Sequence, residues 1–293
     1  MALLRVVTAV LAFVIKAYAP NPGLCVAQHC GVPLLECGLD HVCRQWMLCT
    51  SGCPKTDLAC QVRCGDLYKP TDNTSGTINK FSECTISDHR CVPQEHQVCH
   101  VPGHTQTKRP FKLSDLSGTW YITRGWNPLF DCFDCQIHRF SVNYTWAKPL
   151  HGTMKYSVRK KLQCTAGPGG DCEYLPREVM QAFVQNATDS SHLLNYNNTA
   201  AEMHYHDDWY VLASEPDSFV LVYYCGCNDA VCGYAGAVLY TRSAELSSLS
   251  QDDIDKIQEA IQLAGVDGFT WESLCSPVNS NCLDKATQEI WFV

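Results

Sequence analysis

The chain has 293 residues with 22 Lys and Arg against 30 Asp and Glu, which gives a net charge of −8, and 20 of its residues are cysteine. A chain of this length holds one large domain or two ordinary ones, and an acidic chain without basic runs excludes DNA and RNA binding as expected functions. An even number of cysteines at this density indicates a disulfide framework formed in an oxidising compartment.

Residues 1–19 have the pattern of a signal or targeting peptide. Arg5 precedes an apolar run over 6–15, and the small-residue sequence from Ala17 to Pro20 resembles a cleavage site. The run is too short to span a membrane, and no later run reaches the roughly 18 apolar residues of a transmembrane helix. We therefore expect this segment to be removed and the mature protein to be soluble, with a membrane-anchored N-terminus as the alternative.

Residues 25–100 form a predicted Cys-rich domain that contains eleven of the twenty cysteines. Cys49 and Cys53 are four residues apart, as are Cys60 and Cys64, so each pair shares one face of a helix. Two such helices packed antiparallel can be joined by two disulfides, which predicts a small stapled helical hairpin. A zinc site is the alternative, which the spacing and the oxidising context disfavour. Because eleven is odd, at least one cysteine must stay free or pair outside the domain.

A segment rich in Pro, Gly and Thr over 101–110 is typical of a linker, and residues 111–247 after it have the pattern of β structure. Seven runs there are short, aromatic or β-branched, and bounded by turn residues. They cover residues 118–123, 136–140, 152–158, 182–185, 208–212, 219–224 and 237–241. Seven or more strands at this spacing predict a closed barrel or a sandwich.

Residues 248–293 are predicted to hold one amphipathic helix and a tail. The sequence Ser-Gln-Asp-Asp over 250–253 is typical of a helix N-terminus. Ile254 and Ile257 then begin an apolar pattern at helical spacing that ends at Gly265.

The β region opens with Gly118-x-Trp120 and closes with Thr241-Arg242, which is the pattern of a lipocalin. In that fold the Trp lies across the closed end of the barrel, where an Arg from the last strand covers its ring. The predicted fold class is mainly β: a lipocalin-type eight-stranded barrel with a C-terminal helix, preceded by a small disulfide-rich helical domain. Such a barrel holds one elongated apolar ligand.

Three stretches resemble the violaxanthin de-epoxidase family of plants and algae, including its shorter de-epoxidase-like branch in algae. They are Trp120 to Gln136 with its FDCFDCQ sequence, His204 to Tyr210 (HYHDDWY), and 222–234, where VYY precedes NDA and GY. A cysteine ladder in the first domain is also similar, and these cysteines are disulfide candidates: Cys30, Cys37, Cys43, Cys49, Cys53, Cys60, Cys64, Cys84 and Cys91.

The resemblance implies a chloroplast enzyme of the thylakoid lumen that binds a violaxanthin-type carotenoid and removes its 5,6-epoxide with ascorbate as reductant and without a metal. It implies catalytic carboxyls at Asp134 and Asp207, and it adds Cys135 and Cys275, which flank the barrel, to the disulfide candidates. Residues that line or support the cavity are implied at Gln136, His138, Gln181, Phe183, Tyr205, Trp209, Tyr224 and Tyr240. We further expect thylakoid lipid to present the carotenoid, with peripheral membrane association and a pH-dependent dimer.

Opening an epoxide requires a proton on its oxygen, which a carboxylic acid delivers if burial keeps it protonated. We therefore predict that Asp134 and Asp207 are the acids and that desolvation raises their pKa. The alternative is that both are hydrogen-bonded residues at turns or strand ends. His138, His204 and His206 titrate near the pH of an acidified lumen, so their protonation is a second source of pH dependence. For His204 and His206 a structural role is the better interpretation.

Two departures from the plant pattern bear on the reaction. The chain ends at Val293 without a Glu-rich extension, and Cys232 stands where the plant pattern has an acidic residue. Both favour the redox-neutral alternative, an isomerase that forms an allenic xanthophyll such as neoxanthin, although reductive de-epoxidation remains the first expectation. A non-catalytic carrier of carotenoid or lipid is the third expectation.

Six further cysteines are expected to form three disulfides at the barrel mouth: Cys132, Cys164, Cys172, Cys225, Cys227 and Cys232.

Overall fold

The computed structural model describes residues 22–53, 58–68, 76–91, 99–161, 164–165, 170–200, 203–228 and 232–280. The chain divides into two compact units, one made mainly of residues 1–96 and one mainly of residues 97–293. The predicted targeting peptide 1–19 and the last thirteen residues of the predicted tail lie outside the described residues. Within those residues, every helix is too short or too polar to cross a membrane.

The first unit consists of short helices. They are α2 (Pro22–His29), α3 (Gly31–Leu39), α4 (His41–Gly52), α5 (Leu58–Leu67) and α6 (Gly76–Ser82), followed by a π-helical turn (Glu83–Asp88). Asp40 caps α4, because its side chain accepts a hydrogen bond from the Cys43 N–H at 2.7 Å. Isolated helices of this length are marginal in water, so their stability must come from packing and cross-links.

Five disulfides cross-link this helical unit. They are Cys25–Cys91, Cys30–Cys84, Cys37–Cys43, Cys49–Cys64 and Cys53–Cys60. The last two join α4 to α5 and confirm the predicted stapled hairpin. The apolar core around the cystines is small, with Val26, Leu34, Met47 and Phe81 among its buried residues, so the disulfides supply much of the stability.

The sulfur atoms of Cys53, Cys60 and Cys64 lie within 4.8 Å of one another. Each of them belongs to a disulfide. Zinc binds the thiolate form of cysteine, so this cluster is not a metal site in the oxidised protein.

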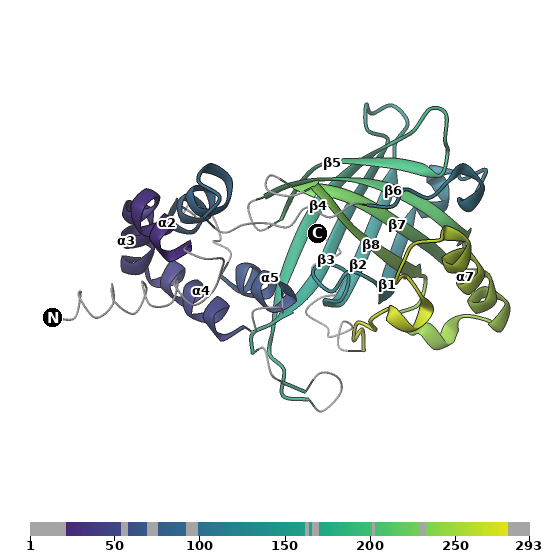
Figure 1. Ribbon diagram of the computed structural model, residues 1–293. Coiled ribbons are helices and arrows are strands. Elements are labelled where there is room, and N and C mark those ends of the chain that lie inside the picture. Colours follow the sequence, from purple (N-terminus) through teal and green to yellow (C-terminus); the bar gives the residue numbers. More distant parts are fainter. Residues whose placement is uncertain are drawn as a thin grey trace. The chain divides into compact units, whose positions relative to one another are not determined.

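The second unit is built on eight strands that close into a barrel in chain order. They are β1 (Gly118–Gly125), β2 (Asp134–Val142), β3 (Leu150–Arg159), β4 (Tyr174–Gln185), β5 (His192–Ala200), β6 (Met203–Glu215), β7 (Phe219–Asn228) and β8 (Cys232–Thr241). The closed barrel and the helix that follows confirm the predicted fold class (Figure 1). The sequence pattern does not predict β5, because three asparagines, which strands disfavour, interrupt it.

The predicted Trp–Arg pair closes one end of the barrel. Trp120 is fully buried, and the guanidinium carbon of Arg242 lies 3.5 Å from the centre of its ring. Arg242 also donates hydrogen bonds to the backbone oxygens of Ser117 and Thr119, at 3.0 and 3.2 Å. Gly118, the first residue of β1, has a φ of 97°, a left-handed conformation that favours glycine. A Cβ atom at this position would lie 3.1 Å from the Arg242 guanidinium, so the glycine allows the arginine to approach β1 closely. The sequence prediction is confirmed.

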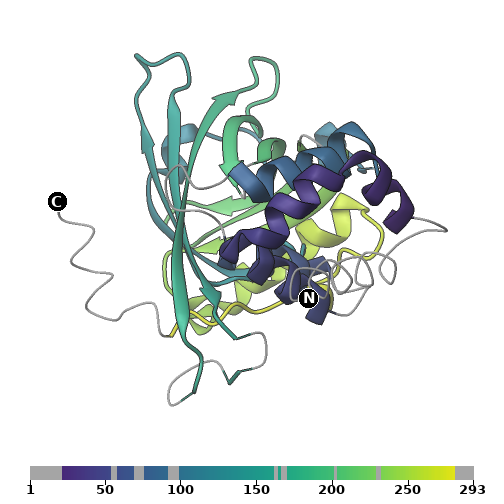
Figure 2. The same ribbon diagram turned by 90° about the vertical axis from the view of Figure 1, so that its left-hand side faces the viewer.

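Helix α7 (Gln251–Ala264) packs on the outer face of the barrel. Ser250 caps its N-terminus and Gly265 ends it in the left-handed conformation. Ile257 and Ile261 are buried against apolar residues of β6, β7 and β8. The hairpin of β3 and β4 runs past the ends of the neighbouring strands (Figures 1 and 2).

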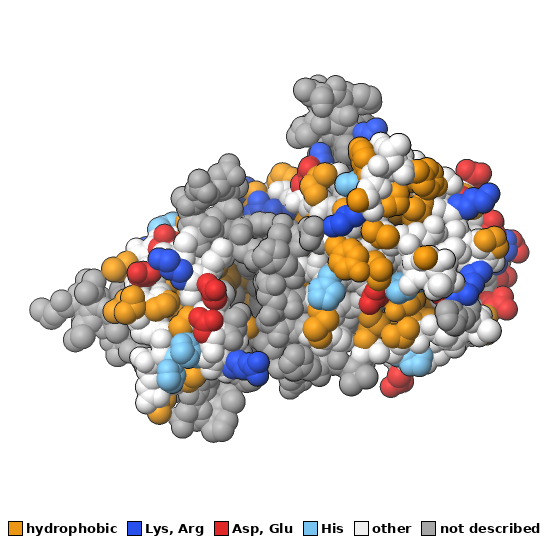
Figure 3. Space-filling view, turned by 90° about the horizontal axis from the view of Figure 1, so that it is seen from above, with side chains coloured by type: hydrophobic (Ala, Val, Ile, Leu, Met, Phe, Trp, Pro, Cys, Tyr) orange, Lys and Arg blue, Asp and Glu red, His pale blue; other side chains and the backbone are white. Residues whose placement is uncertain are grey.

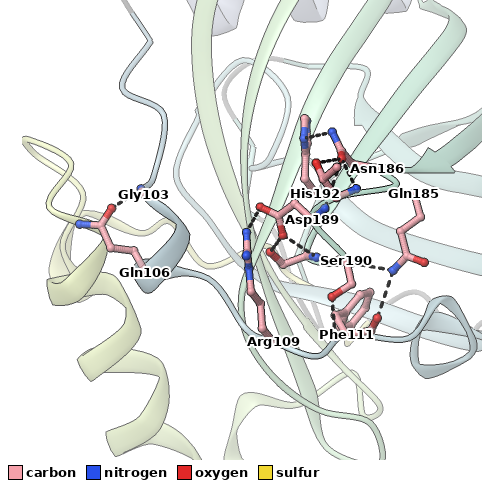
Figure 4. A network of polar contacts seen from close by, with 11 residues as sticks. Gly103, Gln106, Arg109, Phe111, Gln185, Asn186, Asp189, Ser190 and His192 are labelled. Atoms are coloured by element: carbon pink, nitrogen blue, oxygen red, sulfur yellow. Dashed lines mark hydrogen bonds and ion pairs between the residues drawn. The ribbon is translucent and has the colours of Figure 1, made fainter.

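Figure 4 shows that the segment before the barrel is tied to the turn between β4 and β5. The Gln185 amide donates hydrogen bonds to the backbone oxygens of Phe111 and Ser190, at 3.1 and 2.6 Å. Arg109 forms an ion pair with Asp189. The segment that resembles a linker in sequence is therefore bound to the barrel over part of its length.

The disulfides of the barrel unit correct one prediction. The pairs are Cys99–Cys225, Cys132–Cys275, Cys164–Cys172 and Cys227–Cys232, and Cys135 is also disulfide-bonded. The expectation of three disulfides among six cysteines is wrong, because Cys132 and Cys225 pair with residues outside that set. The segment before the barrel brings Cys99 to β7, and the chain after α7 brings Cys275 to the loop before β2. Cys99 is thus the odd cysteine of the first domain.

Candidate active site

Aromatic side chains line the interior of the barrel. Phe183 and Trp209 lie with ring centres 4.6 Å apart, and the His138 ring lies 4.9 Å from Phe140 and 5.4 Å from Tyr240. All eight residues implied as cavity-lining are buried: Gln136, His138, Gln181, Phe183, Tyr205, Trp209, Tyr224 and Tyr240. The structure therefore brings these side chains to one enclosed, largely apolar interior.

Two polar atoms of this interior lack a hydrogen-bond partner among the described residues, Gln136 Oε1 and Asn195 Oδ1. The side chains of His138 and Gln181 lie close enough to hydrogen-bond to each other. His138 Nδ1 lies 2.6 Å from the Tyr240 hydroxyl, and burial lowers the pKa of His138 to about 3, so the imidazole is neutral. Buried polar groups are normally paired. These atoms therefore mark places where a ligand that carries polar groups on an apolar body would bind.

Asp207 of β6 is the first of two carboxyls in the barrel that form a pair with a tyrosine. The Tyr234 hydroxyl donates a hydrogen bond to Asp207 Oδ1, and the Asn195 amide donates one to Oδ2 at 3.3 Å. Desolvation raises the pKa of Asp207 to about 6, although both hydrogen bonds oppose the shift. Below that pH the carboxyl holds a proton.

A glycine makes room for this pair. Gly226 of β7 is the strand partner of Asp207 on one side and of Tyr234 on the other. A Cβ atom on Gly226 would overlap both the Asp207 carboxylate and the Tyr234 ring. The missing side chain therefore allows the two groups to meet above the backbone of β7.

Asp131 is the second of these carboxyls and was not among the predicted acids; it is buried, whereas Asp207 is half-buried. The Tyr224 hydroxyl donates to its Oδ1 at 2.7 Å, and the N–H groups of Asn127 and Ala237 donate to its Oδ2 at 2.8 and 3.2 Å. Desolvation nevertheless raises the pKa of Asp131 to about 7. Gly236 leaves the space that the Tyr224 hydroxyl occupies. The sequence signal that could have identified Asp131 is its position as the first aspartate of FDCFDCQ.

The two carboxyl–tyrosine pairs are neighbours. The rings of Tyr224 and Tyr234 are 6.3 Å apart, and both Asp131 and Asp207 contribute to the raised pKa of Tyr234. Desolvation raises the pKa of both tyrosines far above the ordinary value, so their hydroxyls stay protonated and act as donors. Phe130 adds an aromatic wall, 5.5 Å from the Tyr234 ring.

Asp134 has different surroundings from those expected of a buried acid. Its carboxylate is buried and receives two hydrogen bonds from the Arg159 guanidinium, at 2.7 and 3.1 Å, and one from the Val278 N–H at 3.1 Å. A bidentate pair with a guanidinium requires the ionised carboxylate. Asp134, the first residue of β2, thus fits the structural alternative of a hydrogen-bonded strand-end residue, whereas Asp131 and Asp207 are the carboxyls that accept hydrogen bonds from tyrosines.

The histidines of β6 do not join this site within the described part of the chain. His206 is exposed, and the side chain of His204 lies outside the described residues. His138 is the one predicted histidine that the structure places in the interior, and the prediction that its protonation adds a second source of pH dependence is wrong, because burial lowers its pKa to about 3.

Comparisons with known proteins agree with this architecture. A protein-family model described as the VDE lipocalin domain matches residues 22–279. The chain is 34% identical over 264 residues to a protein named violaxanthin de-epoxidase, chloroplastic, of Nicotiana tabacum, which covers 86% of this chain and 51% of that protein. The protein of the same name from Spinacia oleracea is 34% identical over 251 residues, with 83% and 48% covered. The chain spans about half the length of the curated relatives it matches.

A solved structure with a similar fold is H1 crustacyanin from the lobster Homarus americanus. Its sequence is 14% identical, and the match covers 67% of this chain and 96% of that chain with a TM-score of 0.44. The fold assignment depends on the strand order and the family model.

The different surroundings of the two aspartates predict opposite effects on stability. Asp134→Asn should lower the free energy of unfolding by about 2–3 kcal/mol, because it breaks a partly buried ion pair. Asp207→Asn should not lower the free energy of unfolding at neutral pH, because the pKa of Asp207 is raised to about 6. Between pH about 4 and about 6 the folded protein holds a proton on Asp207 that the unfolded chain has lost. The stability of the unsubstituted protein therefore falls as pH rises through this window.

Urea unfolding of both variants at several pH values tests this difference. The stability of Asp207→Asn relative to the unsubstituted protein should grow from pH 4 to pH 7. A constant difference over that range would contradict the raised pKa of Asp207.

Proposed function

The chain belongs to the violaxanthin de-epoxidase family, and from that membership we propose that it is an enzyme that opens the 5,6-epoxide of violaxanthin-type carotenoids inside its barrel. The observation that supports the proposal is the pair of interior carboxyls, Asp207 and Asp131, each hydrogen-bonded to a tyrosine and each with a raised pKa. The curated relatives are named chloroplastic. We therefore also propose a plastid location, in the thylakoid lumen, reached by the N-terminal targeting segment.

The interior suits an elongated polyene with polar ends. Burial of an apolar chain among Phe140, Phe183 and Trp209 gains about 25 cal/mol for each Å² removed from water. The unpartnered Oε1 of Gln136 and the paired side chains of His138 and Gln181 lie in the same interior, where a ring hydroxyl can hydrogen-bond to them. A xanthophyll combines both kinds of group.

The first chemical step is acid-assisted opening of the epoxide. Asp207 gives its proton to the epoxide oxygen, the C–O bond breaks with its electron pair going to oxygen, and positive charge develops on the tertiary ring carbon. The carboxylate that remains accepts the Tyr234 hydrogen bond and faces the cation. The aromatic faces of Phe130 and Tyr205, 5.6 Å apart, add further stabilisation. Asp131, whose pKa is also raised, is a second carboxyl that can hold a proton close to Asp207.

Two fates of the cation are compatible with this step. In the reductive path, two electrons and two protons from ascorbate, as a co-substrate, convert the epoxide to a double bond, and its oxygen leaves as water. In the redox-neutral path, the adjacent chain carbon loses a proton, which gives an allene and keeps the oxygen as a hydroxyl. We propose the reductive path, because the relatives carry the name de-epoxidase.

A carrier that only transports carotenoid is the competing function. An apolar barrel serves both roles equally well. Buried carboxyls cost stability without benefiting a carrier, since their desolvation is unfavourable. The two carboxyl–tyrosine pairs therefore favour an enzyme.

We also propose that the carotenoid reaches the barrel from a lipid surface. Four exposed apolar residues lie on the outward side of β4 and β5 and on the loop between β2 and β3: Tyr144, Trp146, Met180 and Tyr196. Trp146 contacts the His151 ring at 4.5 Å, and the Lys148 ammonium lies 5.5 Å from the centre of the Tyr196 ring. His151 pairs with Ala182 and Ala182 with Tyr196, so the patch is continuous across three strands.

The charge of this patch supports an anionic lipid surface as the occupant. Figure 3 shows a face of the molecule on which hydrophobic side chains are interspersed with Lys, Arg and His and with some Asp and Glu. Lys148 and the exposed Arg139 of β2 add positive charge near the patch, although the whole chain has a net charge of −8. Aromatic and basic side chains together are typical of a membrane interface.

Asp207→Asn should lower kcat on violaxanthin by about 10²–10⁴-fold while carotenoid binding, measured by the shift of its absorption spectrum, is retained. In the unsubstituted protein, turnover should fall as pH rises through about 6, because the acid form of Asp207 is lost. Equal loss of binding and turnover would support the carrier.

The reductant distinguishes the two reaction paths. Violaxanthin incubated with the protein at pH near 5 should yield de-epoxidised product only when ascorbate is present, as chromatography of the pigments would show. Formation of an allenic product without ascorbate would overturn the reductive assignment in favour of the isomerase.

Trp146→Ser with Tyr196→Ser should reduce the fraction bound to vesicles of anionic lipid at pH 5 by about tenfold, because two interfacial aromatic side chains are lost. Leu263→Ser removes an equally exposed apolar side chain from α7 and is the matched control. Unchanged vesicle binding, or a loss of self-association instead, would contradict a lipid occupant.

A further inference from the structure

The last residues of β7 and the first residues of β8 carry a disulfide beside the candidate active site. Cys227 and Cys232 are directly paired residues of the two strands and are joined by a disulfide. The adjacent cross-strand pair is Gly226 and Tyr234. The disulfide is thus one ladder step away from the tyrosine that bonds Asp207.

A bulge separates the disulfide from Tyr234. The register shifts between Gly226 and Cys227, and the extra residue on β8 is Gly233 at φ 90°. Bulges of this kind re-aim the next side chain and increase the local twist of the strands. The Tyr234 ring turns inward here, where its hydroxyl bonds Asp207 and also lies 3.4 Å from the Cys227 backbone oxygen.

Such an arrangement needs a constraint. A tyrosine next to a glycine bulge near the end of a hairpin loses conformational freedom when it adopts one position. A cross-link over the bulge removes much of that freedom in advance. The position of Cys232 in the strand pair supplies the cross-link at that place.

We propose that the Cys227–Cys232 disulfide is a positioning element of the active site: it fixes the bulge at Gly233 and thereby holds the Tyr234 hydroxyl on the Asp207 carboxyl. The effect of this disulfide on turnover rests on the proposed function. The contact between Tyr234 and Asp207, and its effect on the pKa of Asp207, are independent of that function.

The effect on Asp207 has a definite sign. A donor that bonds the carboxylate favours the ionised form, so its loss raises the pKa of Asp207. The other groups around the carboxyl are the Asn195 amide, the Tyr205, Tyr224 and Tyr240 side chains, and the carboxyls of Asp208 and Asp131. The substitutions below leave all of these groups in place.

The chain offers a matched control. Cys164 and Cys172 form a disulfide within the segment that connects β3 to β4, with eight residues of sequence separation against five for Cys227–Cys232. The side-chain hydrogen bonds of Asp207 come from β5 and β8 and its strand partner is Gly226 of β7, so its described contacts do not include the Cys164–Cys172 pair. Removing it therefore tests for a general effect of losing a hairpin disulfide.

The experiment is a ¹³C NMR titration of protein with labelled aspartate carboxyls, with the Asp207 signal assigned by Asp207→Asn. Tyr234→Phe, and Cys227→Ser with Cys232→Ser, should each move the Asp207 midpoint upward by about one pH unit. Combining the three substitutions should add nothing, and Cys164→Ser with Cys172→Ser should leave the midpoint unchanged. If the variant with Cys227→Ser and Cys232→Ser does not fold, the variant with Cys227→Val and Cys232→Val is used instead, because it keeps an apolar contact between the two strands. The same shift of the Asp207 midpoint is expected.

A wild-type midpoint in the Cys227/Cys232 variants, or a shift that adds to that of Tyr234→Phe, would overturn the proposal. The titration needs no substrate. A protein that converts no epoxide would therefore refute the proposed function and leave this result readable. Where turnover is observed, its fall with rising pH should move by the same amount as the Asp207 midpoint.

Discussion

Keeping an ionisable carboxyl out of water inside a closed barrel is the constraint on which the rest of this structure depends. Desolvation favours the protonated form of Asp207 and Asp131, and hydrogen bonds from two tyrosines limit the shift without cancelling it. Gly226 and Gly236 supply the space in which these pairs form. Three features therefore set the pKa of these carboxyls: the closed barrel raises it, the two tyrosine donors limit the rise, and the two glycines leave room for the pairs.

The remainder of the unit keeps that wall closed. Arg242 over Trp120 seals one end, and α7 covers the outer face of β6 to β8. Disulfides attach the chain before the barrel to β7 and the chain after α7 to the loop that carries Asp131. Because the cross-links join segments far apart in sequence, they limit the opening motions that would admit water to the carboxyls.

Sequence alone predicts the features that local pattern or a short spacing determines. The barrel, the Trp120–Arg242 pair, the start and end of α7 and the stapled hairpin of α4 and α5 are of this kind. The ion pair of Asp134 with Arg159 is not, since it depends on the register of β2 and β3, and neither is the meeting of Asp131 with Tyr224, 93 residues apart. Two aspartates three residues apart therefore look alike in sequence, and only the fold gives one a guanidinium and the other a tyrosine.

The most direct test is a crystal structure of Asp207→Asn with violaxanthin bound. We expect the polyene to lie among Phe140, Phe183 and Trp209, with an epoxide oxygen within hydrogen-bonding distance of the residue 207 side chain and near Tyr234. A carotenoid on the outer surface, or an epoxide turned away from both carboxyl positions, would contradict it.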